Sequence, residues 1–167
     1  PGTRTHLKEI MRRVPGLVGV EVSPHQQVEG RWRSAMAAAT GSFCAFLEPG
    51  DQLSRTALYE FAVAIASRPD LVLLYCDEDR LGSDGQRCHP SFKTGWSRDL
   101  AYAGDVIGQL AVFSRRRIMA VGGARDDGGS CTRYELLLRV TDNGAEARMH
   151  QLPRILFYRG RTPGLPR

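Results

Sequence analysis

The sequence lacks any long hydrophobic run and any apolar stretch near its start. No segment approaches the roughly 20 apolar residues that a membrane-spanning helix requires, and the first residues do not resemble a secretory signal. We therefore expect a cytoplasmic protein. The chain begins with Pro1 instead of Met, as expected of a piece of a longer polypeptide.

The cysteines do not form a metal-binding pattern. None of the four takes part in a C-x-x-C pair, and the four histidines are far apart, so the usual spacing of a structural zinc site is missing. Cys44 and Cys76 lie in apolar segments, where a reduced cysteine packs as a small hydrophobic side chain. We expect reduced, structural cysteines.

The charge is basic but not concentrated. The net charge is +5, from 23 basic and 18 acidic residues, which is compatible with nucleic acid, an anionic membrane or a phosphate-bearing substrate. The arginines are scattered, and no run of five basic residues or nucleic-acid motif occurs. We expect no nucleic-acid partner; a basic RNA- or membrane-surface module is a hypothesis that rests on net charge alone.

The length of 167 residues predicts a single domain over 1–167 with a real core. Short apolar runs predict strands at 17–22, 43–47, 71–76, 110–113, 148–152 and 155–158, the last two at an edge. Helical patterns are expected at 5–13, 31–39, 54–68, 116–121 and 134–140. This alternation predicts an α/β fold, a mostly parallel sheet flanked by helices.

Carboxylates follow two of the predicted strands. Glu48 and Asp51 come after 43–47, and the sequence DED at 77–79 comes after 71–76. Ligands of open α/β sheets bind beyond the carboxyl ends of the strands, where carboxylates hold a metal or a sugar hydroxyl. The alternatives are that Asp51 only begins the next helix and that 77–79 is a solvated turn.

Several motifs in a fixed order resemble family 2 glycosyltransferases, in the bacterial branch that builds O-antigen and related surface polysaccharides. The resemblance extends over about 33–164. The residues that carry it are FLEPGDQL (46–53), LYCDEDR (74–80), DGQR (84–87), FK (92–93), WSRDL (96–100), VGG (121–123), YELLLR (134–139) and LPRIL (152–156).

This resemblance implies a GT-A (Rossmann-like) fold and inverting transfer of a sugar from a nucleotide-diphosphate donor to a glycan or lipid-linked acceptor. It places the nucleotide-sugar side at about 17–80 and the acceptor side at about 81–167. A divalent cation, Mg²⁺ or Mn²⁺, would clamp the diphosphate. Lipid-linked acceptors further imply attachment to the periphery of the inner membrane.

The resemblance also assigns donor-side residues. The metal motif of the family falls on 48–50, so Glu48 and the following Asp51 are the expected metal ligands, whereas Gly50 has no ligand atom. The expected donor-binding residues are Glu48, Asp51, Asp77, Glu78, Asp79 and Lys93. Lys93 would offset phosphate charge, or it is an exposed lysine without a specific role.

On the acceptor side, Arg133 occupies the position of the family's catalytic base. An arginine stays protonated and cannot accept a proton, so Glu135 or Asp127 is the expected substitute. Trp96, Gln109 and Arg133 are expected to face the acceptor; Trp96 is alternatively a core residue, and Arg133 alternatively a surface arginine.

Two departures from the family pattern suggest an alternative. The apolar strand and short segment that hold the nucleotide base in the family have no counterpart before Thr5, so the fold is expected to be incomplete at the N-terminus. Gly50 and Arg133 replace carboxylates. The alternative function is therefore a non-catalytic GT-A-like domain used for binding or scaffolding.

Overall fold

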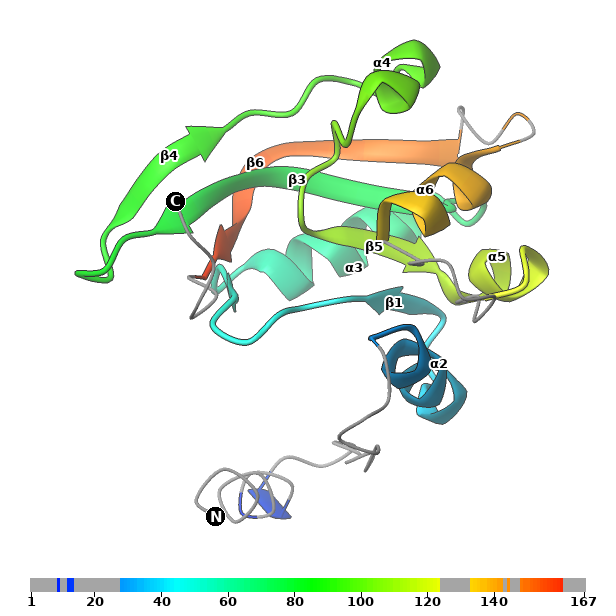
Figure 1. The fold of residues 1–167 in the computed structure, drawn as a ribbon, viewed down its shortest axis with the longest axis horizontal. Helices are drawn as coiled ribbons and strands as arrows, with labels where there is room; N and C mark the ends of the chain where they lie inside the picture. The colour runs from blue at the N-terminus through cyan, green and yellow to red at the C-terminus, as the bar shows by residue number, and fades with distance from the viewer. Residues whose placement is uncertain are drawn as a thin grey trace. The chain divides into compact units, whose positions relative to one another are not determined.

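The computed structural model describes residues 9, 12–13, 28–123, 133–142, 144 and 148–160 (Figure 1). Contacts within the chain divide it into two units, one of residues 1–40 and 124–131 and the other of residues 41–123 and 132–167. The division of a single domain into a donor side and an acceptor side is not tested by these units and stays a prediction.

In the first unit, the described part is mainly the helix α2 (Val28–Ala38). Its alanine-rich sequence has high helix propensity, which confirms the helix predicted at 31–39. Residues 9 and 12–13 are helical, as expected for 5–13. The strand predicted at 17–22 lies outside the described residues.

The second unit contains a sheet of six described strands. They are β1 (Phe43–Ala45), β2 (Gln52–Leu53), β3 (Leu73–Leu81), β4 (Arg87–Ser91), β5 (Ala111–Ser114) and β6 (Met149–Arg159). Their order is β1-β5-β3-β6-β2, and β4 pairs with the far half of β3. The long strands β3 and β6 run side by side through the middle (Figure 1).

The described strands do not meet the expectation of a mostly parallel sheet. Of their five pairings, only β3 with β6 is parallel, and the other four are antiparallel. One reason is local: the tight turn at 82–86 joins β3 directly to β4, and such a short connection permits only an antiparallel pair. The fold is α/β with a mixed sheet.

The two edge strands predicted at 148–152 and 155–158 form one strand instead. β6 pairs with β3 on one side and with β2 on the other, so it is internal. Its register against β3 shifts after the Cys76–Leu152 pair, where Pro153 has no N–H to donate to a ladder. The proline made the segment read as two short strands.

Four described helices accompany this sheet. They are α3 (Ala57–Ser67), α4 (Arg98–Ala103), α5 (Arg115–Ala120) and α6 (Arg133–Thr141). Three were predicted within a few residues, whereas α4 and the strand β4 were not. The core between α3 and the sheet includes Phe61, Leu74 and Phe157, each no more than 6% exposed.

The sequence pattern places the carboxylates at 77–79 beyond the end of a strand. In the structure they lie within β3. The strand that starts with the buried run from Leu73 to Cys76 continues through them to Leu81, because β6 and β4 supply pairing partners on both sides. Asp77 and Asp79 are only 4% exposed. A solvated turn at 77–79 is therefore wrong.

Candidate functional site

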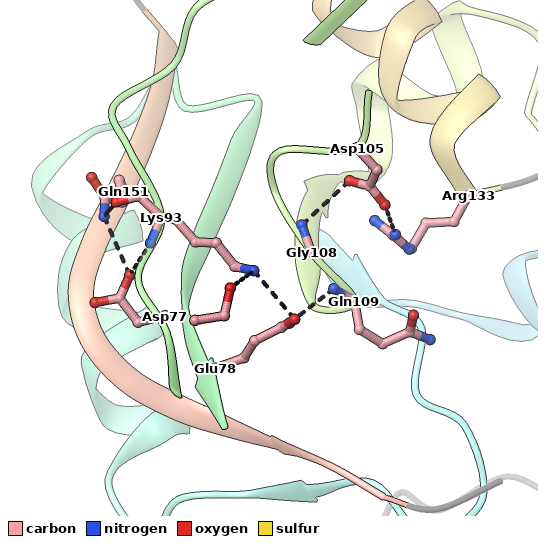
Figure 2. A network of polar contacts seen from close by, with 9 residues as sticks. Asp77, Glu78, Lys93, Asp105, Gly108, Gln109, Arg133 and Gln151 are labelled. Atoms are coloured by element: carbon pink, nitrogen blue, oxygen red, sulfur yellow. Dashed lines mark hydrogen bonds and ion pairs between the residues drawn. The ribbon is translucent and has the colours of Figure 1, made fainter. Parts of the chain in front are cut away.

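Asp77 connects the segment after β4 to the centre of the sheet through hydrogen bonds. Its Oδ1 accepts hydrogen bonds from the backbone N of Lys93, at 2.7 Å, and from Nε2 of Gln151, at 3.4 Å. The same Gln151 Nε2 donates to the Lys93 carbonyl at 2.6 Å. A buried carboxylate requires such partners, and here they come from β6 and from the chain that follows β4 (Figure 2).

Glu78 and Lys93 form a buried ion pair beside Asp77. Lys93 Nζ lies 3.2 Å from Glu78 Oε1 and donates to Ser91 Oγ at 2.9 Å. The side chains of Lys93 and Glu78 are 8% and 13% exposed. Both expected donor-binding residues are therefore held by each other, which fixes their positions and neutralises their charges.

The loop between α4 and β5 contacts this ion pair through its backbone. The N–H of Gln109 donates to Glu78 Oε2 at 3.0 Å. Gly108 has φ of +84°, and a Cβ there would lie 2.6 Å from both Glu78 Oε2 and Lys93 Nζ. The positive φ favours glycine, and a Cβ there would displace the ends of the Glu78 and Lys93 side chains.

The same loop carries Asp105, which joins the network to α6. Asp105 Oδ1 accepts from the N–H of Gly108 at 3.3 Å, and Oδ2 contacts Nη2 of Arg133. Arg133 is the first residue of α6. Its Nη1 is buried and has no hydrogen-bond partner among the described residues. Figure 2 shows the two carboxylates, Glu78 and Asp105, on either side of Gly108.

The helices α4 and α6 are joined by contacts in antiparallel order. Asp105 follows α4 and contacts Arg133 at the start of α6, the Tyr134 hydroxyl donates to the Ala101 carbonyl, and Arg98 pairs with Asp142 after the end of α6 at 3.4 Å. The position of Asp105 therefore depends on the packing of these two helices.

Asp79 has a different partner from its neighbours on β3. Its Oδ2 accepts from Arg87 Nε at 2.6 Å, and the Arg87 guanidinium stacks over the Tyr158 ring at 4.7 Å. This hydrogen bond raises the pKa of Arg87. Asp79 Oδ1 is buried without a hydrogen-bond partner in the described part of the chain. Asp79 thus joins β3 to β4 and β6, outside the network around Glu78.

Glu48 and Asp51 form a turn that is anchored to the end of β6. Asp51 Oδ2 accepts from the N–H of Glu48, and Oδ1 accepts from the N–H of Gly160, both at 2.9 Å. A Cβ on Gly160 would lie 2.3 Å from the Gly50 carbonyl carbon. Each carboxylate oxygen of Asp51 therefore accepts a hydrogen bond from a backbone N–H group.

A cation in this turn would have to share the Asp51 carboxylate with two backbone N–H groups. Both Asp51 oxygens already accept N–H bonds, and Gly50 has no ligand atom. Among the residues that the structure describes, no three His, Cys, Asp or Glu side chains form a group that could hold a metal. The metal role of Glu48 and Asp51 stays a prediction, and we derive no step from it.

Of the two expected substitute bases, Glu135 has a structural partner. Arg139 Nε lies 2.5 Å from Glu135 Oε1, and Arg139 Nη2 donates to Oε2 at 3.0 Å. Arg139 also donates to the carbonyls of Val121 and Gly123, so this pair ties α6 to the end of α5. Asp127 lies outside the described residues.

Trp96 borders a surface hollow between α4 and α6. The hollow holds about 200 Å³ of empty space, and Tyr102 and Leu138 also line it. Trp96 Nε1 is buried and has no hydrogen-bond partner among the described residues. The hollow lies beside the Arg98–Asp142 pair, at the opposite end of α6 from Arg133.

The sulfur and phenol groups on β3 are poor nucleophiles. Burial raises the pKa of Cys76 to about 12, and burial together with the nearby Asp77 carboxylate raises the pKa of Tyr75 to about 12. The Tyr75 hydroxyl donates to the Thr94 carbonyl at 2.9 Å. Both groups remain protonated near neutral pH, as expected of core residues.

The structure thus gathers part of the predicted site. Asp77, Glu78, Lys93 and Gln109 lie in one network, to which Arg133 is joined through Asp105. Five other expected site residues lie outside this network and make the separate contacts given above: Glu48, Asp51, Asp79, Trp96 and Glu135. Sequence reasoning missed Asp105, Gly108 and Gln151. A signal existed for Asp105, since it is a carboxylate shortly before Gln109 in a predicted loop.

Comparison with known proteins finds sequence similarity to an O-antigen biosynthesis protein and to an uncharacterized protein. The chain is 34% identical over 144 residues, 84% of its length, to the O-antigen biosynthesis protein RfbC of Myxococcus xanthus. It is 33% identical over 131 residues, 78% of its length, to the uncharacterized protein y4gI of Sinorhizobium fredii. No family model matches the chain.

The chain spans only a small part of these relatives, 11% of the Myxococcus protein and 14% of the Sinorhizobium protein. Within the described ranges, the helices are all too short or too polar to cross a bilayer.

Proposed function

We propose that this chain is part of a family 2 glycosyltransferase with the GT-A fold. It transfers a sugar, with inversion, from a nucleotide-diphosphate donor to a hydroxyl of a glycan or lipid-linked acceptor during synthesis of a cell-surface polysaccharide. The likeness to an O-antigen biosynthesis protein over 84% of the chain supports this assignment. We place the reaction in the cytoplasm, at the periphery of the inner membrane, where lipid-linked acceptors are found.

The observation that carries the proposal is the convergence of four expected site residues. Asp77 and Glu78 on β3, Lys93 after β4 and Gln109 before β5 come from three segments of the chain. Their hydrogen bonds and ion pair fix the loop at 104–110 against β3. A transferase needs such rigid placement, because productive geometry must be maintained to within a fraction of an ångström.

The charged side chains of the site are paired with one another in the described part of the chain. The Glu78–Lys93 pair is internally neutral, so it supports the loop instead of adding a free charge. Arg133 contributes a cation next to Asp105. A Mg²⁺ or Mn²⁺ ion, if used, would be carried mainly by the phosphates of the donor, since such ions often bind through only one or two carboxylates plus substrate phosphates.

The second candidate is a non-catalytic GT-A-like domain used for binding or scaffolding. Two observations favour it. Asp51 is used by the backbone of its turn, and Glu135 is bound to Arg139. In that case the network around Glu78 would be retained for stability alone.

Calorimetric titration of the purified chain with UDP and with dTDP, each with and without Mn²⁺, tests the leading proposal. We expect one nucleotide to bind with a micromolar Kd. The matched control is Asp84→Asn, which changes an Asp of an exposed turn whose Oδ1 accepts only the Gln86 N–H in the described contacts; it should bind equally well. If neither nucleotide binds under any condition, the same titration on an N-terminally extended chain separates a missing N-terminal strand from a dead site, and a second negative result favours the non-catalytic domain.

A further inference from the structure

Arg133 cannot serve as the base, but it is in contact with a carboxylate that can. Arg133 Nη2 touches Asp105 Oδ2 across the short distance between α6 and the loop after α4. On the basis of the function proposed above, we propose that Asp105 is the catalytic base and that Arg133 is its positioning residue.

The loop backbone gives the Asp105 carboxylate a fixed place. The N–H of Gly108 donates to Oδ1 at 3.3 Å, and the next N–H, that of Gln109, donates to Glu78 Oε2 at 3.0 Å. The loop is therefore tied to the Glu78–Lys93 pair four residues beyond Asp105. A base must be held within hydrogen-bonding reach of the proton that it removes, and these contacts hold it.

Among the carboxylates that the structure describes around this network, Asp105 combines access to solvent with spare acceptor capacity. Its side chain is 30% exposed, against 13% for Glu78 and 5% for Asp79. Glu135 is 36% exposed, but both of its oxygens bind Arg139 at 3.0 Å or less. Each carboxylate oxygen has two acceptor positions, so Asp105 Oδ1, with one long hydrogen bond, can still receive a hydroxyl.

The step balances without any further reagent. The oxygen of the acceptor hydroxyl attacks the anomeric carbon of the donor sugar and forms the new glycosidic bond. The bond between that carbon and the diphosphate oxygen breaks, and its electron pair leaves with the nucleoside diphosphate. The hydroxyl proton passes to Asp105. A single displacement of this kind inverts the anomeric centre.

Arg133 acts through Asp105. The guanidinium neutralises and orients the ionised carboxylate before the acceptor arrives. The Arg133 side chain is only 13% exposed and its Nη1 is buried, so the guanidinium is enclosed beside the carboxylate that it orients.

The test is release of nucleoside diphosphate from UDP-hexoses and dTDP-hexoses by the purified chain, with octyl hexosides as acceptors. Asp105→Asn should lower kcat by about 10² to 10⁴-fold, the usual contribution of a general base, while its affinity for UDP or dTDP stays unchanged. Asp84→Asn is the matched control and should keep full activity. Arg133→Gln should lower kcat by a smaller factor.

The pH dependence separates a base from a merely structural residue. With Asp105 as the base, kcat/KM should fall at acid pH as the carboxylate takes up a proton, and Asp105→Asn should abolish this acid limb. Asp105→Glu keeps the charge and should recover part of kcat with the acid limb present. If Asp105→Asn does not fold, Asp105→Glu decides: unchanged kcat and an unchanged pH profile would overturn the role of Asp105.

The failure of this role and the failure of the proposed function give different results. A wild-type chain that releases nucleotide, together with an Asp105→Asn variant of equal kcat, would overturn the role of Asp105 and leave the transferase intact. A wild-type chain that neither binds UDP or dTDP nor releases nucleotide from any of the donors would count against the transferase, and against the base with it.

Discussion

Glu78 and Lys93 form an ion pair that is almost completely removed from solvent, with 3.2 Å between Nζ and Oε1. Glu78 lies on β3 and Lys93 lies in the segment after β4. The two are brought together because β4 pairs with β3 in antiparallel fashion. A buried pair of this kind adds little net stability relative to an apolar pair, but breaking it leaves an uncompensated charge. Its value to the molecule is the placement of the loop at 104–110.

Lys93→Met should strongly destabilise the second unit. The substitution leaves the Glu78 carboxylate buried without its cation, which typically costs about 3–5 kcal/mol of unfolding free energy. Urea unfolding, followed by circular dichroism, measures the loss. The double variant Glu78→Gln/Lys93→Met should lose clearly less, since no unpaired charge remains.

The matched control for this prediction is the Arg98–Asp142 pair, whose side chains are 54% and 48% exposed. Arg98→Met should cost no more than about 1 kcal/mol, the usual limit for an exposed pair. An equal loss in Lys93→Met and Arg98→Met would show that the burial of Lys93 has no energetic consequence.

Gly108→Ala should destabilise the site far more than Gly122→Ala. Both glycines have positive φ, +84° and +88°, so both alanine variants carry a similar backbone strain. At Gly108 the new Cβ would also lie 2.6 Å from Glu78 Oε2 and Lys93 Nζ, whereas no described atom lies within 4 Å of a Cβ at Gly122. We expect an additional loss of about 1–3 kcal/mol at Gly108, the usual cost of overpacking, measured by urea unfolding. Equal losses would contradict the close packing of the loop.

The parts of the fold that follow local patterns could be predicted from the sequence. The apolar run before Asp77 marks the buried half of β3, and the alanine-rich segment marks α2. Strand direction was predicted incorrectly, because nothing local in β5 or β1 records that they pair in antiparallel fashion. The end of β3 was also missed, since three charged residues in a row look like a loop.

The site itself depends on contacts that span the chain. Asp77 is stabilised in the sheet by Lys93, 16 residues away, and by Gln151, 74 residues away. Asp105 meets Arg133 over a separation of 28 residues. Motif order indicated most members of the network, but no periodicity or spacing could show that Asp51 binds backbone N–H groups and that Asp105 faces Arg133.

Asp51→Ala should reduce stability without changing the effect of Mn²⁺ on nucleotide binding. The variant removes the acceptor of the Glu48 and Gly160 N–H groups, which should cost about 1–3 kcal/mol. Asp84→Ala, which removes the acceptor of a single N–H in an exposed turn, should cost less. Urea unfolding and calorimetric titration with and without Mn²⁺ provide the two measurements. Loss of the Mn²⁺ effect in Asp51→Ala alone would contradict this expectation and support the metal role predicted from the sequence.

The stability of the chain should decline as the pH rises above about 9. Burial raises the pKa of Cys76 from 9.0 to about 12 and that of Tyr75 from 10.0 to about 12. In the pH range between each pair of values, the unfolded chain has released a proton that the folded chain still holds. The unfolding free energy therefore decreases with pH, by up to about 1.4 kcal/mol per pH unit for each fully titrating group. Urea unfolding at pH 8, 9, 10 and 11 should show full stability at pH 8 and a growing loss above pH 9. Tyr75→Phe should make the decline less steep above pH 10, because one of the two groups no longer titrates; a wild-type stability that stays level up to pH 11 is incompatible with the burial of both groups.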